Sequence, residues 1–354
     1  MRRWSGCGAR RAKSSLDTLT HALSGALLAR ATAPRDAPPR ALPRRIAAGF
    51  FACAAPDLDF VVGFVGPVEY LLWHRGVTHS ILLLPAWALL YSWILAKLLR
   101  EPDREGKAGW RALYGVTALA LGAHIVGDLI TSFGTIILAP LSDWRAGIGT
   151  TFIIDLWFSG IILAGLLFSL VFRRSRMPAL TATFFLCGYV AFQYVQKQRA
   201  LEFGAEYARS QALRDAKVTA HPKPVSPFNW TVFVSDDEAH RFAHVNLVRK
   251  EARRFQPGDG FIARVDAPYL PLGQAVWVTR RRYGETENDQ IRGAWNSEPL
   301  AFFRWFADLP AFDGMSQGCV WFTDLRFLTP GREGMPFRYA VCRERSGGSW
   351  MLKL

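Results

Sequence analysis

The strongest constraint on the fold is a series of apolar runs, each long enough to cross a bilayer. Ser80 to Leu99 contains a single charge, Lys97, and Phe152 to Phe172 contains a single charge, Asp155. About 20 apolar residues in a helix cross roughly 30 Å of hydrocarbon. Further runs that we expect to span are residues 46–66, 112–130 and 179–195. We therefore predict an α-helical polytopic membrane bundle of about five spans.

The chain changes character after residue 200. From Trp230 onward, short runs such as "TVFVS", "FAHVNLV" and "CVWFTDLRFL" alternate apolar and polar residues and are rich in β-branched and aromatic side chains, a pattern typical of strands. One helix is expected near "PLAFFRWFADL". We predict a basic N-terminal tail over residues 1–15, a helical membrane domain over residues 16–199, and a smaller β-rich (α+β) extramembrane domain over residues 200–354.

The positive charge belongs mainly to the membrane half. The formal net charge is +14, and basic clusters lie at residues 2–13, 30–45, 97–111 and 173–176. Basic connections between spans stay on the cytoplasmic side. We therefore expect the C-terminal domain on the exterior side of the membrane, and the basic pI does not require a nucleic acid partner.

Histidines in the membrane half lie close to carboxylates. Asp17 and His21 share one helical face, His124 and Asp128 have the same spacing, and imidazole with carboxylate is the donor set of Zn²⁺ and related ions. A buried aspartate in a bilayer costs about 3 kcal/mol without a partner, so a shared polar or metal site is expected. The predicted metal ligands are His21, Asp57, His74, His79, His124 and Asp128.

Arg75 lies between the two histidines of "HRGVTHS". A guanidinium beside a metal can hold a phosphate, and we predict Arg75, Asp57 and Asp59 as catalytic residues. The alternative for Arg75 is an interfacial arginine that meets lipid headgroups. For the histidines and aspartates, the alternatives are hydrogen bonds between helices, or a proton relay.

Five ordered motifs carry a family resemblance: "LDTLTHALSGAL", "APDLDF", "HRGVTHS", "GAHIVGDLITSFGT" and "LSDWRAGIGTTFIIDLWF". Over residues 16–175 the chain resembles the bacterial inner-membrane metal-dependent hydrolase family of the YdjM/YbcI type. That family is similar to zinc-dependent phospholipase C and S1/P1-type nucleases, so the resemblance implies an HxxxD ligand pair at His124 and Asp128. Because the chain has one HxxxD motif, one or two metal ions are expected rather than three.

These patterns lead to one function and two alternatives. We expect a multi-pass protein of the bacterial inner membrane that uses a divalent metal, zinc by preference, to hydrolyse a lipid or lipid-linked phosphoester at the outer face. One alternative is a non-catalytic membrane protein with a structural metal or polar cluster and a partner-binding β domain. The other is a proton- or ion-coupled carrier.

Two features of the C-terminal region complete the predictions. Cys319 and Cys342 could pair if their domain is exported, or remain buried thiols. "HRFAH" places His240 and His244 at a metal-like spacing, but in a strand-turn context that we interpret as surface rather than as a second site.

Overall fold

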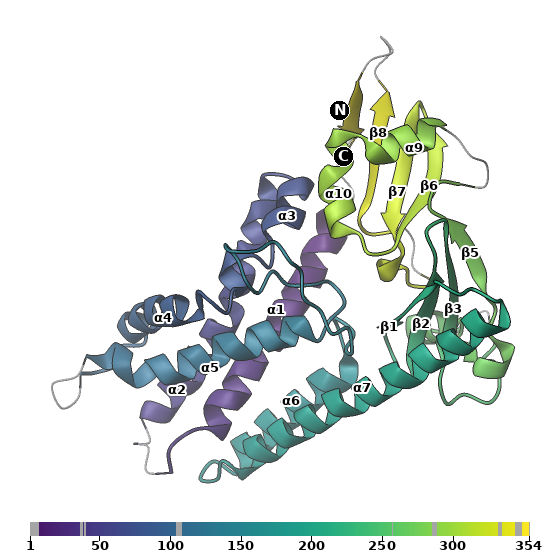
Figure 1. Cartoon of the computed structure of the whole chain (residues 1–354). Coiled ribbons are helices and arrows are strands. Elements are labelled where there is room, and N and C mark those ends of the chain that lie inside the picture. The colour runs from purple at the N-terminus through teal and green to yellow at the C-terminus, as the bar shows by residue number, and fades with distance from the viewer. Residues whose placement is uncertain are drawn as a thin grey trace. The chain divides into compact units, whose positions relative to one another are not determined.

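The computed structural model describes residues 7–35, 38, 40–103, 108–256, 258–284, 289–331, 335–343 and 349–353. The chain forms two compact units, Met1–Phe192 and Gln193–Leu354 (Figure 1). Helix α7 (Met177–Ser210) runs across this boundary, and the division expected between residues 199 and 200 also falls within that helix.

The first unit is helical in its described residues, as the apolar runs predict. Its elements before α7 are α1 (Cys7–Ala31), α2 (Ala41–Ala54), the 3-10 helix η1 (Pro56–Phe64), α3 (Pro67–Trp73), the 3-10 helix η2 (Val77–His79), α4 (Leu84–Leu98), α5 (Gly109–Leu129) and α6 (Leu156–Val171). Residues 1–6 of the expected basic tail lie outside the described residues, whereas residues 7–15 are helical within α1.

The prediction of five spans is too high. Among the described residues, three helical stretches are long and apolar enough to cross a membrane, namely Ala41–Phe64, Gly109–Leu129 and Met177–Ser210. A fourth arises if Pro67–His79 and Leu84–Leu98, which are bent by 81°, count as one broken span.

The expected span at residues 152–172 forms only the 16 residues of α6. Asp155 caps the start of this helix, because its side chain accepts hydrogen bonds from the backbone N–H groups of Trp157 and Phe158. The helix is therefore about 24 Å long, shorter than the hydrocarbon layer.

Close packing of α1 against α2 depends on two glycines. A Cβ atom on Gly25 would lie 2.1 Å from the carbonyl oxygen of Gly49, and one on Gly49 would lie 2.5 Å from the carbonyl oxygen of Gly25. Small residues at such a crossing let two backbones approach each other within a membrane. This contact brings two helices together. Helix α1 carries Asp17 and His21 of the polar site described below, and α2 leads into η1, which carries Asp57.

The basic connections between helices meet at one end of this unit. Arg30 donates to the carbonyl oxygen of Arg173 at 2.6 Å, and Arg176 donates to that of Ala33 at 3.0 Å. Arg44 lies 3.6 Å from the carboxylate of Glu101. Three connections thus form contacts at one end, through arginines of two of them and Glu101 of the third, while Asp57 follows the other end of α2, and His124 and Asp128 lie near the other end of α5.

The second unit is β-rich, as predicted. One sheet has the order β1-β2-β3-β4, with β5 also paired to β3, and the other has the order β6-β7-β8-β9. The strands are β1 (Lys217–Pro222), β2 (Asn229–Ser235), β3 (Ala239–Asn246), β4 (Leu270–Pro271), β5 (Val278–Arg281), β6 (Pro310–Ser316), β7 (Cys319–Asp324), β8 (Arg338–Arg343) and β9 (Trp350–Lys353). The helices are α8 (Phe261–Asp266), α9 (Asp289–Asn296) and α10 (Ala301–Phe306), and α10 confirms the helix expected in this region.

Two details of this unit resolve or correct the sequence analysis. Cys319 and Cys342 face each other across β7 and β8 and form a disulfide. His240 and His244 do lie on a strand, β3, but they are not surface residues. His240 is buried and bonds to Ser235 and to the carbonyl of Pro310, because β3 is an inner strand of its sheet.

Candidate metal centre

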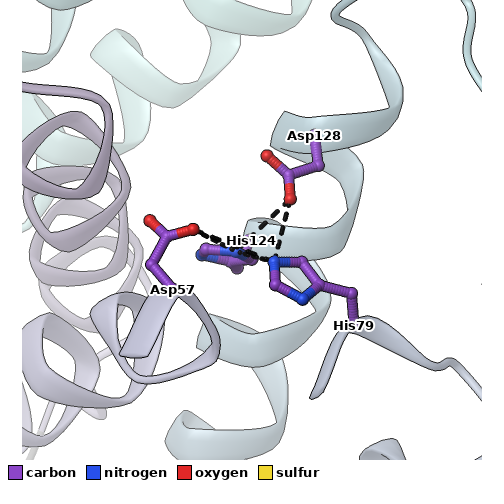
Figure 2. Close-up of side chains that lie close together, drawn as sticks. All are labelled: Asp57, His79, His124 and Asp128. Carbon is purple, nitrogen blue, oxygen red and sulfur yellow. Dashed lines mark hydrogen bonds and ion pairs between the residues drawn. The ribbon is translucent and has the colours of Figure 1, made fainter. Parts of the chain in front are cut away.

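Four buried side chains converge where α2 ends and α5 ends. Asp57 lies in the first turn of η1, directly after α2, and His79 ends η2. His124 and Asp128 are one turn apart near the C-terminal end of α5. One ligand atom from each of the four lies within 4.8 Å of all the others, and Figure 2 shows the side chains pointing toward a common centre.

The distances within this group, which we call the four-residue group, are those of donors around one centre. His79 Nε2 is 3.1 Å from Asp128 Oδ2 and 3.9 Å from Asp57 Oδ1. His124 Nε2 is 3.5 Å and 3.6 Å from the same two oxygens. The two Nε2 atoms are themselves 2.9 Å apart.

Hydrogen bonds to the opposite ring nitrogens orient both histidines. His124 Nδ1 lies 2.6 Å from the carbonyl oxygen of Cys53, which can only accept, so Nδ1 carries the hydrogen. In the neutral ring Nε2 then presents a lone pair to the centre. His79 Nδ1 lies 3.4 Å from Asp59 Oδ2 and 2.9 Å from Thr78 Oγ1. A carboxylate or carbonyl behind each imidazole is the usual arrangement around metal-binding histidines.

A second set of possible ligands shares Asp128 with the first. It consists of Asp17, His21 and Asp128, with their ligand atoms also within 4.8 Å of one another. His21 Nε2 lies 3.2 Å from Asp128 Oδ1 and 3.7 Å from Asp17 Oδ1. The ring centre of His21 lies 4.0 Å from that of His124, and the two ring planes are tilted by 34°. One carboxylate thus offers an oxygen to each set.

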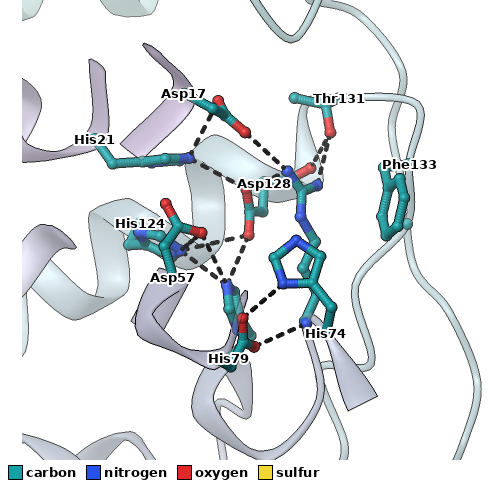
Figure 3. A network of polar contacts seen from close by, with 12 residues as sticks. Asp17, His21, Asp57, His74, His79, His124, Asp128, Thr131 and Phe133 are labelled. Atoms are coloured by element: carbon teal, nitrogen blue, oxygen red, sulfur yellow. Dashed lines mark hydrogen bonds and ion pairs between the residues drawn. The ribbon is translucent and has the colours of Figure 1, made fainter. Parts of the chain in front are cut away.

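Figure 3 shows Asp17, Asp128 and Thr131 close together, and Arg75 is the cation that contacts all three. Its side chain is 2% exposed, and Nη2 lies 2.9 Å from Asp128 Oδ1 and 3.3 Å from Asp17 Oδ2. Nη1 donates to Thr131 Oγ1 at 3.0 Å, and the guanidinium lies 5.0 Å from the ring centre of Phe133. Its Nε is buried and donates no hydrogen bond. The backbone of Arg75 has a φ of 61°, a conformation that non-glycine residues rarely adopt and that often marks functional sites.

His74 and Asp59 form a supporting layer rather than part of either ligand set. His74 Nδ1 lies 2.6 Å from Asp59 Oδ1. The other oxygen, Oδ2, accepts hydrogen bonds from the backbone N–H of Arg75 at 3.0 Å and from Thr78 Oγ1 at 2.8 Å. Asp59 therefore holds the segment that carries His74, Arg75 and His79. The structure brings five of the six predicted ligands into the two sets and places His74 one layer behind.

The donor set fits a divalent cation. Asp57 Oδ2 and both oxygens of Asp128 are buried and accept no hydrogen bond of good geometry. Four carboxylates (Asp17, Asp57, Asp59 and Asp128) surround the single guanidinium of Arg75, so positive charge is lacking when the histidines are neutral. Buried carboxylates without compensation are costly. A metal would supply the missing charge and bind oxygens that accept no hydrogen bond of good geometry.

Some contributors leave little trace in the sequence. Thr131 follows Asp128 by three residues at a helix end, and this spacing could have singled it out. The carbonyl of Cys53 has no sequence signal, because any residue would provide the same oxygen. Asp155 is not part of the cluster: besides capping α6, it accepts a hydrogen bond from Tyr189 Oη at 2.8 Å.

A known family model matches the part of the chain that contains the whole site. The model of the family described as "YdjM inner membrane protein" matches residues 16–200, slightly more than half of the chain. The chain belongs to the YdjM inner membrane protein family. The matched range contains every residue of both ligand sets, Arg75, and the candidate spans Ala41–Phe64 and Gly109–Leu129, which agrees with the resemblance seen in the five sequence motifs.

One curated relative is similar over a limited range. The uncharacterized protein YfhP of Bacillus subtilis (strain 168) is 30% identical over 118 residues, which is 30% of this chain and 34% of YfhP. The match thus spans about a third of the length of YfhP. No solved structure matches.

Proposed function

We propose that this YdjM-family protein is a membrane-bound metal-dependent hydrolase that acts on a phosphoester of a lipid or lipid-linked substrate at the outer face of the inner membrane. The observation that carries the proposal is the convergence of Asp57, His79, His124 and Asp128 beside a buried arginine. A mixed histidine and carboxylate donor set favours zinc among the common divalent ions.

The four-residue group would hold one cation, and Asp17 and His21 with the shared Asp128 would hold a second. A bound cation in such a site supplies Lewis-acid polarisation of a phosphoryl oxygen and an activated water molecule. Asp57 has one buried oxygen without a donor, so it can accept a proton as well as hold a metal. Asp59 keeps the segment of His79 in place from behind.

Arg75 provides the contact to the substrate in this proposal. Its Nε has no partner, and its two terminal nitrogens already form contacts with Asp17, Asp128 and Thr131. A guanidinium that is held by contacts with three residues and keeps one N–H donor without a partner is suited to bind a phosphoryl oxygen. Its rigid placement would favour a transition state in which negative charge grows on that oxygen.

The depth of the cluster supports a lipid substrate. Helix α5 has 21 residues, or about 31 Å, which is close to the thickness of the hydrocarbon layer. Asp128 is next to its last residue, so the cluster lies near one membrane boundary. Large apolar side chains are exposed in the connections around it: Phe64, Val65, Trp73, Leu141 and Trp144. Such a rim is suited to acyl chains and the membrane interface.

The outer face is favoured by two observations. The arginine-rich connections lie at the opposite end from the cluster, and arginine-rich connections stay on the cytoplasmic side. The disulfide between Cys319 and Cys342 is typical of an oxidising compartment, which supports a location of the second unit outside the cytoplasm.

The direct test is hydrolysis of phosphodiesters by the protein purified in detergent. Phosphatidylglycerol vesicles and a soluble glycerophosphodiester would be compared, with release of the product measured in the presence of zinc. We expect cleavage of the lipid by wild type, loss of cleavage in His124→Ala, and retention in Asp143→Asn, an exposed residue of the same unit. Bound metal without cleavage of any phosphoester would favour a structural metal site instead.

A further inference from the structure

A polar face lies within the β-rich unit, away from the residues matched by the family. Register places His221 of β1 opposite Thr231 of β2, and Thr231 opposite His244 of β3. These three side chains form one row across the sheet, and Thr231 Oγ1 lies 2.8 Å from His244 Nδ1. The next row on the same face is aromatic, with Phe233 opposite Phe242. We call the row together with Lys223 and Tyr269 the Lys223 face.

Lys223 is a buried cation, 4% exposed. It directly follows the end of β1, and its charge acts on both His221 and His244. Its Nζ donates to the carbonyl oxygens of Arg326 at 3.0 Å and Leu328 at 2.6 Å. Among the residues that the structure describes, it forms no ion pair with a carboxylate. A buried charge without a counter-ion is unfavourable, so this lysine requires an explanation.

The carboxylates whose charge acts on this face already have partners. The charge of Asp324 raises the pKa of Lys223, but Asp324 is paired with Arg326 at 2.7 Å. The charge of Asp266 raises the pKa of Tyr269, but Asp266 is paired with Arg249 at 2.6 Å. The face therefore has positive charge and no carboxylate of its own to offset it.

Hydrogen-bonding atoms on this face lack partners. Both ring nitrogens of His221 are buried and have no hydrogen bond, and the same holds for the hydroxyl of Tyr269. Tyr269 is fully buried, and its ring centre lies 5.8 Å from that of His244. Most buried polar groups in folded proteins are paired, so the unpaired ring of His221, on which the charge of Lys223 acts, points to a ligand between the two side chains.

We propose that the Lys223 face binds an anionic oxygen group, a carboxylate or a phosphate, with Lys223 supplying charge and the N–H of the neutral His221 ring supplying a hydrogen bond. The ligand would replace the missing counter-ion of Lys223 and would accept a hydrogen bond from a buried ring that has no other partner. This function is separate from the hydrolase proposal and would give the β-rich unit a role as a binding module.

The ionisation of the face agrees with this. Burial lowers the pKa of Lys223 to about 7, with the charge of Asp324 opposing the shift. Burial, followed by the charge of Lys223, also lowers the pKa of His221 and of His244. An anion beside Lys223 would favour its charged form, so binding above neutral pH is coupled to proton uptake.

The test is calorimetric titration of the full-length protein in detergent with inorganic phosphate and, separately, with acetate. Ionic strength is held constant with chloride, and two buffers with different ionisation enthalpies are used slightly above neutral pH. We expect saturable binding of at least one of the two anions, with proton uptake by wild type. Binding of phosphate alone or of acetate alone would identify which anion the face accepts.

Three variants make the result specific. Lys223→Met should abolish binding and proton uptake, and a cooperative melting transition would show that the variant is folded although the carbonyls of Arg326 and Leu328 lose their donor. His221→Phe should bind about tenfold more weakly, since one hydrogen bond to a charged group is lost. Lys217→Met, at the exposed start of β1, should behave as wild type. Absence of binding of both anions to folded wild type, or equal binding by Lys223→Met, would overturn the proposal.

Discussion

His79 Nε2 and His124 Nε2 lie 2.9 Å apart, although 45 positions separate the two residues in the chain. The hydrogen bond from His124 Nδ1 to the carbonyl of Cys53 leaves the Nε2 lone pair of a neutral ring facing its partner. Two ring nitrogens at this distance need a proton or a cation between them. The carboxylates of Asp57 and Asp128 beside the pair favour the cation.

Asp59→Asn should weaken metal binding without removing a ligand. Asp59 contacts His79 Nδ1, His74 Nδ1 and the backbone N–H of Arg75, so the neutral amide would orient His79 less firmly. Loss of such a supporting carboxylate typically lowers affinity 10- to 100-fold, and we expect about that range. Competition with a zinc chelator measures it. Unchanged affinity would remove Asp59 from the supporting layer.

Alanine at Gly25 or at Gly49 should destabilise the first unit. Each added Cβ would lie within about 2.5 Å of the facing carbonyl oxygen, and overpacking of this kind costs about 1–3 kcal/mol or more. Thermal unfolding in detergent measures the effect. Gly115→Ala in α5 is the matched control, because a Cβ there meets nothing within 4 Å. Equal effects at the three positions would contradict the packing described for α1 and α2.

Much of this architecture follows from local patterns. The separation into a helical half and a strand-rich half is visible in hydropathy and alternation, and the i, i+4 spacing of His124 and Asp128 already places both on one helical face. Burial of charge in an apolar helix then demands partners, which explains why these residues could be recognised as one site.

Other features depend on tertiary contacts and could not be predicted in this way. Residues 80–99 carry only one charge, Lys97, yet the chain bends by 81° before Leu84. At this bend Ser80 donates its hydroxyl hydrogen to the carbonyl of Ala139, and the backbone N–H of Ile81 donates to the carbonyl of Ile137. His74 and His79 are close in sequence, but only His79 belongs to the four-residue group, because His74 forms its hydrogen bond with Asp59 instead. Composition gives no indication of either contact.

The stability of the β-rich unit should depend on pH through Lys223. The pKa of this lysine is about 7 in the fold and 10.5 in the unfolded chain. Between these values the unfolded state binds more protons, so the free energy of unfolding rises with pH across this window. Melting curves of wild type and Lys223→Met, compared from about pH 7.5 to about pH 9.5, measure it. We expect a smaller rise in the variant, and parallel curves would contradict the assignment.

The disulfide gives a test of membrane orientation. If the second unit is exported, Cys319 and Cys342 should be oxidised in cells and should react with a membrane-impermeant maleimide in spheroplasts only after reduction. A Cys53→Ser, Cys187→Ser background removes the free thiols described in the structure. Labelling that requires lysis of the inner membrane would place this unit in the cytoplasm.

The most direct test of the metal centre is elemental analysis of the protein purified in detergent, with wild type, His124→Ala and Asp128→Ala measured side by side and Asp143→Asn as control. The structure predicts at least one divalent metal per chain in wild type and in the control. His124→Ala should lose metal, and Asp128→Ala, which removes the carboxylate shared by both ligand sets, should lose at least as much. Folded wild type that holds no metal above background after reconstitution with zinc would contradict the account.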